Sequence, residues 1–284
     1  MKKFSVYPFL IVLVFATSSA SSYSQDKHYP FKVDISGEGK QSIIFIPGFA
    51  CSGEVWNETK SMYEKNYKCY ALTMAGFAGV PPESKPTFQN WEKAIAQFIL
   101  QNNIDQPALV GHSMGGGLAM ALAADYPDLV SKIIVVDALP CLPALMNPSF
   151  KAKLNNDCSG IVSQIGSLSN DQFYRMQKQS AAQLVADTSK QELVAGWSIS
   201  SDRGTFAEMY CDFSNTDLRE KIATIACPAL ILLESYFSNF KPAITDQFKN
   251  LKNFDMRFAT KGLHFVMYDD KEWYSQQLLS FMKQ

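Results

Sequence analysis

The feature that most constrains the fold is a serine flanked by glycines, in residues 110–116 (VGHSMGG). A short apolar run at 108–110 precedes it, and a helical pattern at 115–125 follows it. The G-x-S-x-G spacing places Ser113 on a tight turn between a strand and a helix, where flanking side chains would clash. Such a turn directs the backbone N–H of Met114 toward the space beside the hydroxyl. The pattern therefore predicts an activated serine with an anion-stabilising N–H next to it.

Apolar segments with the spacing of strands alternate with helical segments along most of the chain. Strands separated by helices of about 10 to 15 residues indicate a mostly parallel sheet with helices on its faces, which is an α/β fold. Strands are expected at residues 31–36, 42–46, 67–73, 108–110, 133–136, 229–233 and 254–258, and helices at 54–65, 87–102, 115–125, 245–250 and 272–283.

The alternation is interrupted at residues 140–226, which are richer in Gln, Ser, Asn and Lys and carry short helical patterns such as 171–184. We interpret 140–226 as a helical cap inserted into one domain, whose core comprises residues 25–139 and 227–284. A chain of 284 residues with 47% hydrophobic residues is long and apolar enough to bury such a core.

The amino end has the pattern of a secretory signal peptide. Lys2 and Lys3 precede an apolar run at residues 7–16, and small residues follow that run. We therefore assign residues 1–24 to a signal peptide and expect a secreted or periplasmic protein without a stable membrane anchor after cleavage. A membrane anchor is the disfavoured alternative, because a spanning helix needs about 20 apolar residues.

Charge and cysteine content narrow the choice of partners. A formal net charge of -1 provides no basic surface of the kind that nucleic-acid binders use. The six cysteines form no C-x-x-C motif and no Cys/His ligand spacing, so no metal site is predicted. An oxidising compartment permits disulfides. Among the possible pairings we favour Cys141 with Cys158, because these two residues flank a segment expected to be mobile.

These motifs together resemble the α/β-hydrolase fold superfamily, in its capped esterase-like branch. The resemblance covers nearly all of the mature chain. It rests on residues 46–49 (IPGF) followed by Trp56, on the GHSMGG turn, and on 263–265 (LHF) before Asp269 and Asp270.

The resemblance implies a second oxyanion-hole donor, the backbone N–H of Phe49, which follows the glycine of the first loop. The chain departs from the family pattern at Pro47, where a histidine is usual, and at Met74, where an aspartate is common.

Exclusion identifies the general base among three histidines. His28 precedes the first strand and is expected at the surface. His112 adjoins the serine on a strand end, so its side chain should point away from the hydroxyl and pack beneath the turn. His264 follows the last predicted strand, where a loop can reach back over the sheet edge, and we predict that it takes the proton of Ser113.

Two carboxylates are candidates for the third member of a catalytic triad. In the family the acid often follows the strand after the cap, and Glu234 is the only carboxylate in that stretch. A variant of the fold takes the acid from the end of the preceding strand, where Asp137 stands. Both residues keep the chain order serine, acid, histidine. We favour Asp137 and keep Glu234 as the alternative.

The sequence therefore predicts a serine hydrolase that cleaves a small carboxylic ester, with an amide or lactone as further options. No metal and no organic cofactor is expected. Apolar residues near the turn and at the start of the cap are expected to face the substrate or to pack beneath the cap: Leu139, Leu142, Leu145, Met146 and Phe150. The alternatives are acyl transfer, C–C bond hydrolysis or cofactor-free peroxidation on the same triad, and a non-catalytic binding protein on the same scaffold.

Overall fold

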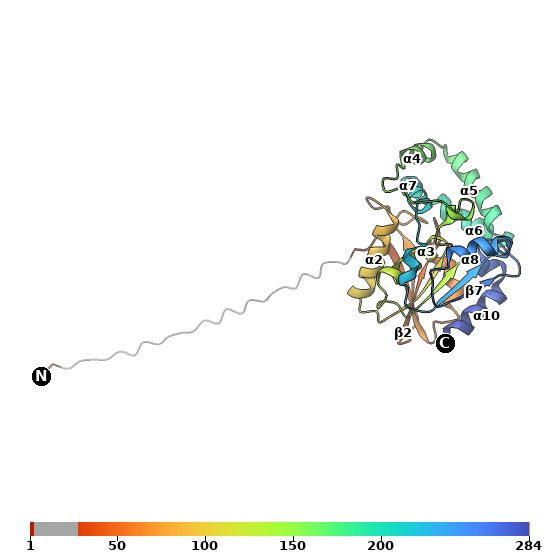
Figure 1. The fold of residues 1–284 in the computed structure, drawn as a ribbon. Coiled ribbons are helices and arrows are strands. Elements are labelled where there is room, and N and C mark those ends of the chain that lie inside the picture. Colours follow the sequence, from red (N-terminus) through yellow and green to blue (C-terminus); the bar gives the residue numbers. More distant parts are fainter. Residues whose placement is uncertain (3–27, 284) are drawn as a thin grey trace.

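The computed structural model describes residues 1–2 and 28–283. The longer part forms a sheet covered by helices, and a further group of helices lies to one side of the sheet (Figure 1). The signal peptide predicted at residues 1–24 lies outside the described residues, apart from the first two, and stays a prediction. In the described part of the chain no helix is long and apolar enough to cross a membrane.

The predicted strands are all present, each within two residues of its expected bounds. In the described chain they form one sheet in the order β1-β3-β2-β4-β5-β6-β7. β1 pairs antiparallel with β3, and the other neighbours are parallel, which confirms the mostly parallel α/β sheet. The strands are β1 (Phe31–Ser36), β2 (Gln41–Ile46), β3 (Tyr67–Met74), β4 (Ala108–His112), β5 (Lys132–Val136), β6 (Ala229–Leu233) and β7 (Phe254–Phe258).

Both faces of the sheet are buried, because apolar side chains alternate between the faces along each central strand. In β2, Ile44 and Ile46 belong to one hydrophobic core, whereas Ile43 and Phe45 belong to the core on the opposite face. Residues of α2, α3 and α8 fill the first core, and residues of α10 fill the second. The central strands therefore read as continuous apolar runs rather than as alternating ones.

The α-helices are α1 (Asn57–Lys60), α2 (Phe88–Gln101), α3 (Met114–Asp125), α4 (Ser159–Gly166), α5 (Asn170–Leu184), α6 (Thr188–Ile199), α7 (Arg203–Ser214), α8 (Lys241–Gln247), α9 (Val266–Asp269) and α10 (Lys271–Met282). Short 3₁₀ helices are η1 (Gly53–Trp56), η2 (Leu142–Leu145), η3 (Lys221–Thr224) and η4 (Ser235–Phe240). The helix expected at residues 54–65 is shorter than predicted. It consists of η1 and α1, and turns at 61–66 then lead into β3.

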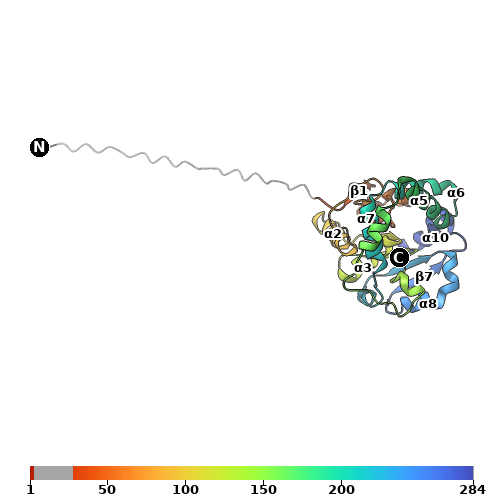
Figure 2. The same cartoon turned by 90° about the horizontal axis from the view of Figure 1, so that it is seen from above.

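Helices α4 to α7 follow β5 and precede β6 in the chain, and they gather on one side of the sheet (Figures 1 and 2). Within this group α5 packs on α6 and α4 packs on α7. Ser169 begins α5 with a capping box, in which its hydroxyl accepts from the backbone N–H of Gln172. The helices thus form two antiparallel pairs that lie over residues at the carboxyl ends of the strands.

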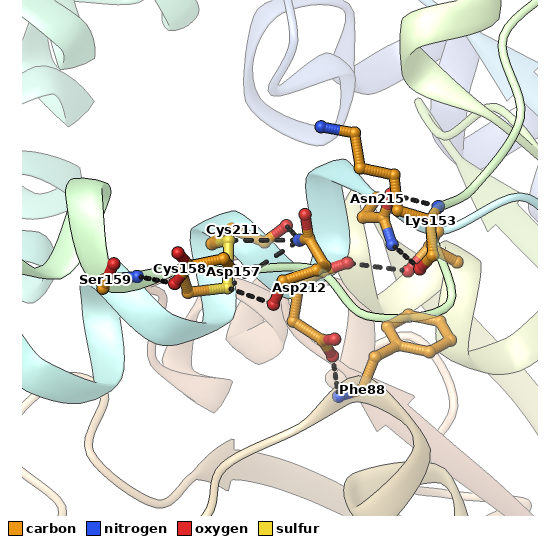
Figure 3. Close-up of a disulfide and its surroundings, with 10 residues drawn as sticks. Phe88, Lys153, Asp157, Cys158, Ser159, Cys211, Asp212 and Asn215 are labelled. Atoms are coloured by element: carbon orange, nitrogen blue, oxygen red, sulfur yellow. Dashed lines mark hydrogen bonds between the residues drawn. A yellow bond between two sulfur atoms is a disulfide. The ribbon is translucent and has the colours of Figure 1, made fainter.

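The disulfide predicted between Cys141 and Cys158 is wrong. Cys158, just before α4, is bonded instead to Cys211 in α7 (Figure 3). Cys141 is buried as a free thiol, and its backbone N–H donates to the side-chain oxygen of Gln247 at 3.1 Å. The pairing depends on how α4 packs on α7, a contact between segments far apart in sequence, and proximity along the chain did not reveal it.

We expect the Cys158–Cys211 bond to stabilise the protein substantially. It closes a loop with a sequence separation of 53 residues, and the lost freedom of the unfolded chain is worth about 4 kcal/mol in the chain-entropy model. Replacing both cysteines by serine should lower the free energy of unfolding, measured by urea denaturation, by about 2 to 4 kcal/mol.

Reductant provides the control for this prediction. It should lower the urea midpoint of the wild type and leave that of the double variant unchanged. Peptide mapping under non-reducing conditions should recover the Cys158–Cys211 pair, and recovery of Cys158 bound to Cys141 would contradict the structure.

Candidate active site

Ser113 stands between β4 and α3 in a backbone conformation that side chains rarely adopt, with φ 52° and ψ -121°. Two hydrogen bonds hold it there. Its N–H donates to the carbonyl of Val136 in β5 at 2.8 Å, and its carbonyl accepts from the N–H of Gly116 at 2.8 Å. The strain at Ser113 is therefore held by the sheet on one side and by the first turn of α3 on the other.

The two glycines of the G-x-S-x-G pattern are required by close approach of the backbone. A Cβ atom on Gly111 would lie 2.1 Å from the carbonyl oxygen of Gly115. A Cβ atom on Gly115 would lie 2.2 Å from the carbonyl oxygen of Ile46 in β2. Because both obstacles are backbone atoms, neither can move aside, and this explains why the turn that presents Ser113 needs glycine at these two places.

Asp137 and His264 are joined by a short hydrogen bond. Nδ1 of His264 donates to Oδ2 of Asp137 at 2.6 Å. The other carboxylate oxygen of Asp137, Oδ1, accepts from the backbone N–H of Glu234 at 2.7 Å. The Asp137 side chain is fully buried, whereas 23% of the His264 side chain remains exposed. The structure thus brings Asp137, rather than the carboxylate of Glu234, into hydrogen-bond contact with the imidazole.

Charge at this site acts on the protonation of His264 and Glu234. Burial lowers the pKa of His264, but the hydrogen bond and the charge of Asp137, with a smaller contribution from Glu234, raise it above its usual value. Burial and the charge of Asp137 raise the pKa of Glu234 to about 7. Near neutral pH, Glu234 is therefore only partly ionised beside a histidine that Asp137 orients.

His112 supports the site in a way that the sequence does not reveal. Its side chain is fully buried, and its Nε2–H donates to the backbone carbonyl of His264 at 2.9 Å. The two rings lie 4.6 Å apart. Burial and the nearby His264 keep the pKa of His112 well below its usual value, so the ring is neutral. His112 thus packs beneath the turn and fixes the loop that carries His264. By contrast, His28 is exposed and pairs with Glu83.

The two residues predicted to supply oxyanion donors are Met114, which directly follows Ser113, and Phe49, which lines the same cavity as Ser113. Met114 is the first residue of α3, where backbone N–H groups have no partner within the helix. Phe49 follows Gly48 in the loop after β2, and its ring packs against Phe206 of the cap helix α7 at 4.6 Å between centroids. Gly48, Phe49 and Ser113 line the same cavity.

A cavity of about 890 Å³ connects these residues to the cap. The core contributes Ser113, Asp137, His264 and Glu234 to its wall, and the cap contributes residues of α4, α5, α6 and α7. The cap residues in the wall are mostly apolar with several amides and hydroxyls among them: Leu142, Ile161, Gln164, Ile165, Met176, Gln177, Ser180, Ala181, Gln183, Leu184, Val194, Ser198, Phe206, Tyr210, Phe213 and Ser214.

The structure corrects the apolar residues expected around the substrate. Leu139 and Leu142 line the cavity. Met146 does not, since it follows η2 with 81% of its surface exposed to solvent. Leu145 and Phe150 are likewise outside the wall, and Leu145 packs against the core instead. Patterning by hydrophobicity did not separate these positions, because the segment after β5 has no regular spacing.

In the described part of the chain, the residues that line the cavity include neither Lys nor Arg. Over residues 1–2 and 28–283, no cluster of three or more His, Cys, Asp or Glu side chains is placed to hold a metal ion. The ionisable groups in the wall other than cysteine and tyrosine are Asp137, Glu234, His112 and His264.

The sheet, the strained serine turn and the histidine–aspartate pair define an α/β-hydrolase fold. A family model described as the alpha/beta hydrolase fold matches residues 41–270, and the chain belongs to this family. Solved structures agree in fold. An esterase from Exiguobacterium antarcticum superposes with a TM-score of 0.74 at 17% identity, covering 89% of this chain and 96% of that one. The enol-lactonase from Burkholderia xenovorans LB400 superposes with the same TM-score at 12% identity, over the same shares of the two chains.

Sequence relatives match at higher identity than these structures, but over a smaller part of this chain. A pimeloyl-[acyl-carrier protein] methyl ester esterase from Edwardsiella ictaluri is 24% identical over 202 residues, which are 68% of this chain and 74% of that protein. A probable lysophospholipase, BODYGUARD 5 from Arabidopsis thaliana, is 29% identical over 113 residues, or 37% of this chain. The chain spans only 26% of the length of that protein, and 37% and 27% of two further relatives.

The electrostatics of the site can be measured without a substrate. We expect an NMR titration to show a pKa of His264 above the ordinary histidine value and to show His112 neutral throughout. Asp137→Asn should shift the pKa of His264 below its ordinary value, because burial is then opposed only by the smaller effect of Glu234. Glu234→Gln should lower it by less. The His264 resonance is assigned with His264→Gln, and a pKa unmoved by Asp137→Asn would contradict the pairing.

Proposed function

We propose that this protein is a serine hydrolase that cleaves a carboxylic ester through an acyl-enzyme. The proposal rests above all on the hydrogen bond between His264 and Asp137. Both residues line the same cavity as the strained Ser113. Ser113 acts as the nucleophile, His264 as general base and then acid, and Asp137 as the group that orients His264.

The geometry of the pair determines which imidazole nitrogen reacts. Nδ1 of His264 carries the proton that it donates to Asp137, so in the neutral imidazole Nε2 is the nitrogen that takes the proton of the Ser113 hydroxyl. The serine oxygen then bonds to the ester carbonyl carbon, and the N–H groups of Met114 and Phe49 stabilise the oxyanion. Nε2–H protonates the departing alcohol. Water then gives a proton to the same nitrogen and adds to the acyl carbon. The bond from that carbon to the Ser113 oxygen breaks, Nε2–H returns the proton to this oxygen, and the acid leaves.

The cavity wall supports a neutral, largely apolar substrate. Most of its lining is apolar, and a substrate carboxylate or phosphate would find no Lys or Arg there. Asp137 and Glu234 would repel such a group. The esterase, the methyl ester esterase and the enol-lactonase among the similar proteins act, by their names, on ester bonds. We therefore place ester hydrolysis ahead of amide hydrolysis.

The disulfide supports the proposal that the protein is exported. Structural disulfides persist in oxidising compartments and are rare in the cytosol. The Cys158–Cys211 bond thus agrees with a signal peptide at residues 1–24 and with a secreted or periplasmic location.

Ser113→Ala should abolish turnover of p-nitrophenyl esters and labelling by a fluorophosphonate probe. The alanine removes the nucleophile and keeps the turn, so circular dichroism should be unchanged and only residual catalysis should remain. Ser214→Ala, in the cap wall of the same cavity, is the matched control and should still be labelled. A folded Ser113→Ala protein with wild-type activity would refute the serine mechanism.

Asp137→Asn should reduce kcat by about 10⁴-fold, as in a comparable triad. The backbone N–H of Glu234 needs an acceptor, so the single side-chain oxygen of the asparagine should take the place of Oδ1. The NH₂ group then replaces Oδ2 and faces Nδ1 of His264. That contact forces the proton onto Nε2 and removes the base. Glu234→Gln keeps the backbone N–H and should change kcat by less than about tenfold. A severe loss in Glu234→Gln with a nearly normal Asp137→Asn would reverse the assignment.

A further inference from the structure

One buried polar group in the cavity wall has no part in the proposed reaction. Gln177 lies on α5, and only 4% of its surface is exposed. It lines the cavity, and its Nε2 is buried without a hydrogen-bond partner in the described chain. Buried amide groups in proteins almost always have a partner, so an unpaired one requires an explanation.

The helix holds Gln177 firmly in this place. Phe173 and Ala181 stand four residues before and after it on the same face of α5, and both are buried. The ring of Phe173 packs against Phe206 of α7 at 5.4 Å between centroids. An apolar side chain would fill this position at less cost, because an unpaired amide loses its hydrogen bonds with water. The last torsion of a glutamine is soft, so its N–H can turn to the cavity while the backbone stays fixed.

The chemistry of the wall restricts what could pair with this amide. A charged acceptor on the substrate is disfavoured, since the wall has no Lys or Arg and contains Asp137 and Glu234. A neutral acceptor, such as a ketone, amide or ester carbonyl, fits. The catalytic residues come from the core, whereas Gln177 comes from the cap, so the acceptor belongs to a part of the substrate away from the scissile bond.

We propose that Gln177 is a specificity-determining residue whose side-chain N–H donates to a second, neutral carbonyl on the substrate. This inference rests on the proposed ester hydrolysis. The preferred substrate is then an ester with a carbonyl farther along its acyl or alcohol chain, and a plain alkyl ester leaves the Gln177 amide unpaired when it fills the cavity.

The test compares kcat/KM for matched pairs of esters. One series consists of p-nitrophenyl octanoate and its analogues with a ketone at successive positions of the chain. The other consists of octyl acetate and the corresponding keto-octyl acetates, followed by acid release. A ketone can only accept hydrogen bonds, so it probes the donor. We expect the wild type to prefer at least one keto ester over its alkyl partner by about tenfold, the value of one neutral hydrogen bond.

Gln177→Met, which is similar in volume and lacks the donor, should lose this preference while it keeps turnover of the alkyl ester. Gln177→Leu, which also has no hydrogen-bond donor, should lose it as well and serves if the methionine variant does not fold. Gln183→Met is the matched control, because Gln183 lines the cavity from the same helix but is exposed, and it should keep the preference.

An equal preference in wild type and in a folded Gln177 variant would overturn the inference, as would a wild type that turns over alkyl and keto esters alike in both series. The absence of turnover of every ester by the wild type would instead overturn the proposed hydrolysis, and the role of Gln177 with it. The two failures are distinguishable, since the first leaves activity intact.

Discussion

The site depends on the two hydrogen bonds that the Asp137 carboxylate accepts. Its two oxygens connect three loops that follow three different strands: Asp137 itself after β5, Glu234 after β6 through its N–H, and His264 beyond β7 through its ring. Because the carboxylate is buried and fully engaged, it has one orientation, and the imidazole follows that orientation. His112 holds the His264 loop from below by a further bond to its carbonyl. The histidine is thus fixed by its side chain and by its backbone.

Two residues of the site have a positive φ, and the sheet accounts for both. Ser113 has φ 52° and Asp137 has φ 50°. Each follows the end of a parallel strand, and each N–H donates to the next strand of the sheet, from Ser113 to Val136 and from Asp137 to Leu232. In each case this is the final hydrogen bond of the strand, and the sharp turn of the chain follows it. Backbone strain at Ser113 and Asp137 is therefore supported by the most regular part of the molecule.

Local patterns in the sequence were sufficient to predict the secondary-structure elements, and they also selected Ser113 and His264, which line one cavity in the structure. Short apolar runs predicted the strands, and the spacing around Ser113 predicted the turn. Elimination among three histidines left His264 as the base. The acid stayed open between Asp137 and Glu234, since both follow neighbouring parallel strands and reach the same edge. Asp137 contributes its carboxylate to the hydrogen bonds of the site, whereas Glu234 contributes its backbone N–H. A residue pattern cannot predict this difference.

Long-range packing within the cap could not be predicted from the sequence. The partner of Cys158 depends on the placement of α4 against α7, and the wrong pairing with Cys141 came from closeness along the chain. The same applies to Met146, which is apolar but exposed, and to Gln177, which is polar but buried. Hydrophobicity predicts burial well in a regular sheet and less well in a cap whose helices cover a cavity.

The cavity wall is divided between the core and the cap, so the proposed chemistry and the proposed substrate selectivity belong to different parts of the molecule. Ser113, Asp137 and His264 are held by bonds within the core, whereas most of the remaining wall comes from α4 to α7. The disulfide links α4 to α7, two helices whose side chains line this wall, and neither of its cysteines lines the cavity itself. Substitutions on the inner face of the cap can therefore change which ligand fits while the hydrogen bonds between Asp137, Glu234 and His264 stay intact. The unpaired amide of Gln177 lies on the cap side of this division, where a group that selects the substrate would be expected.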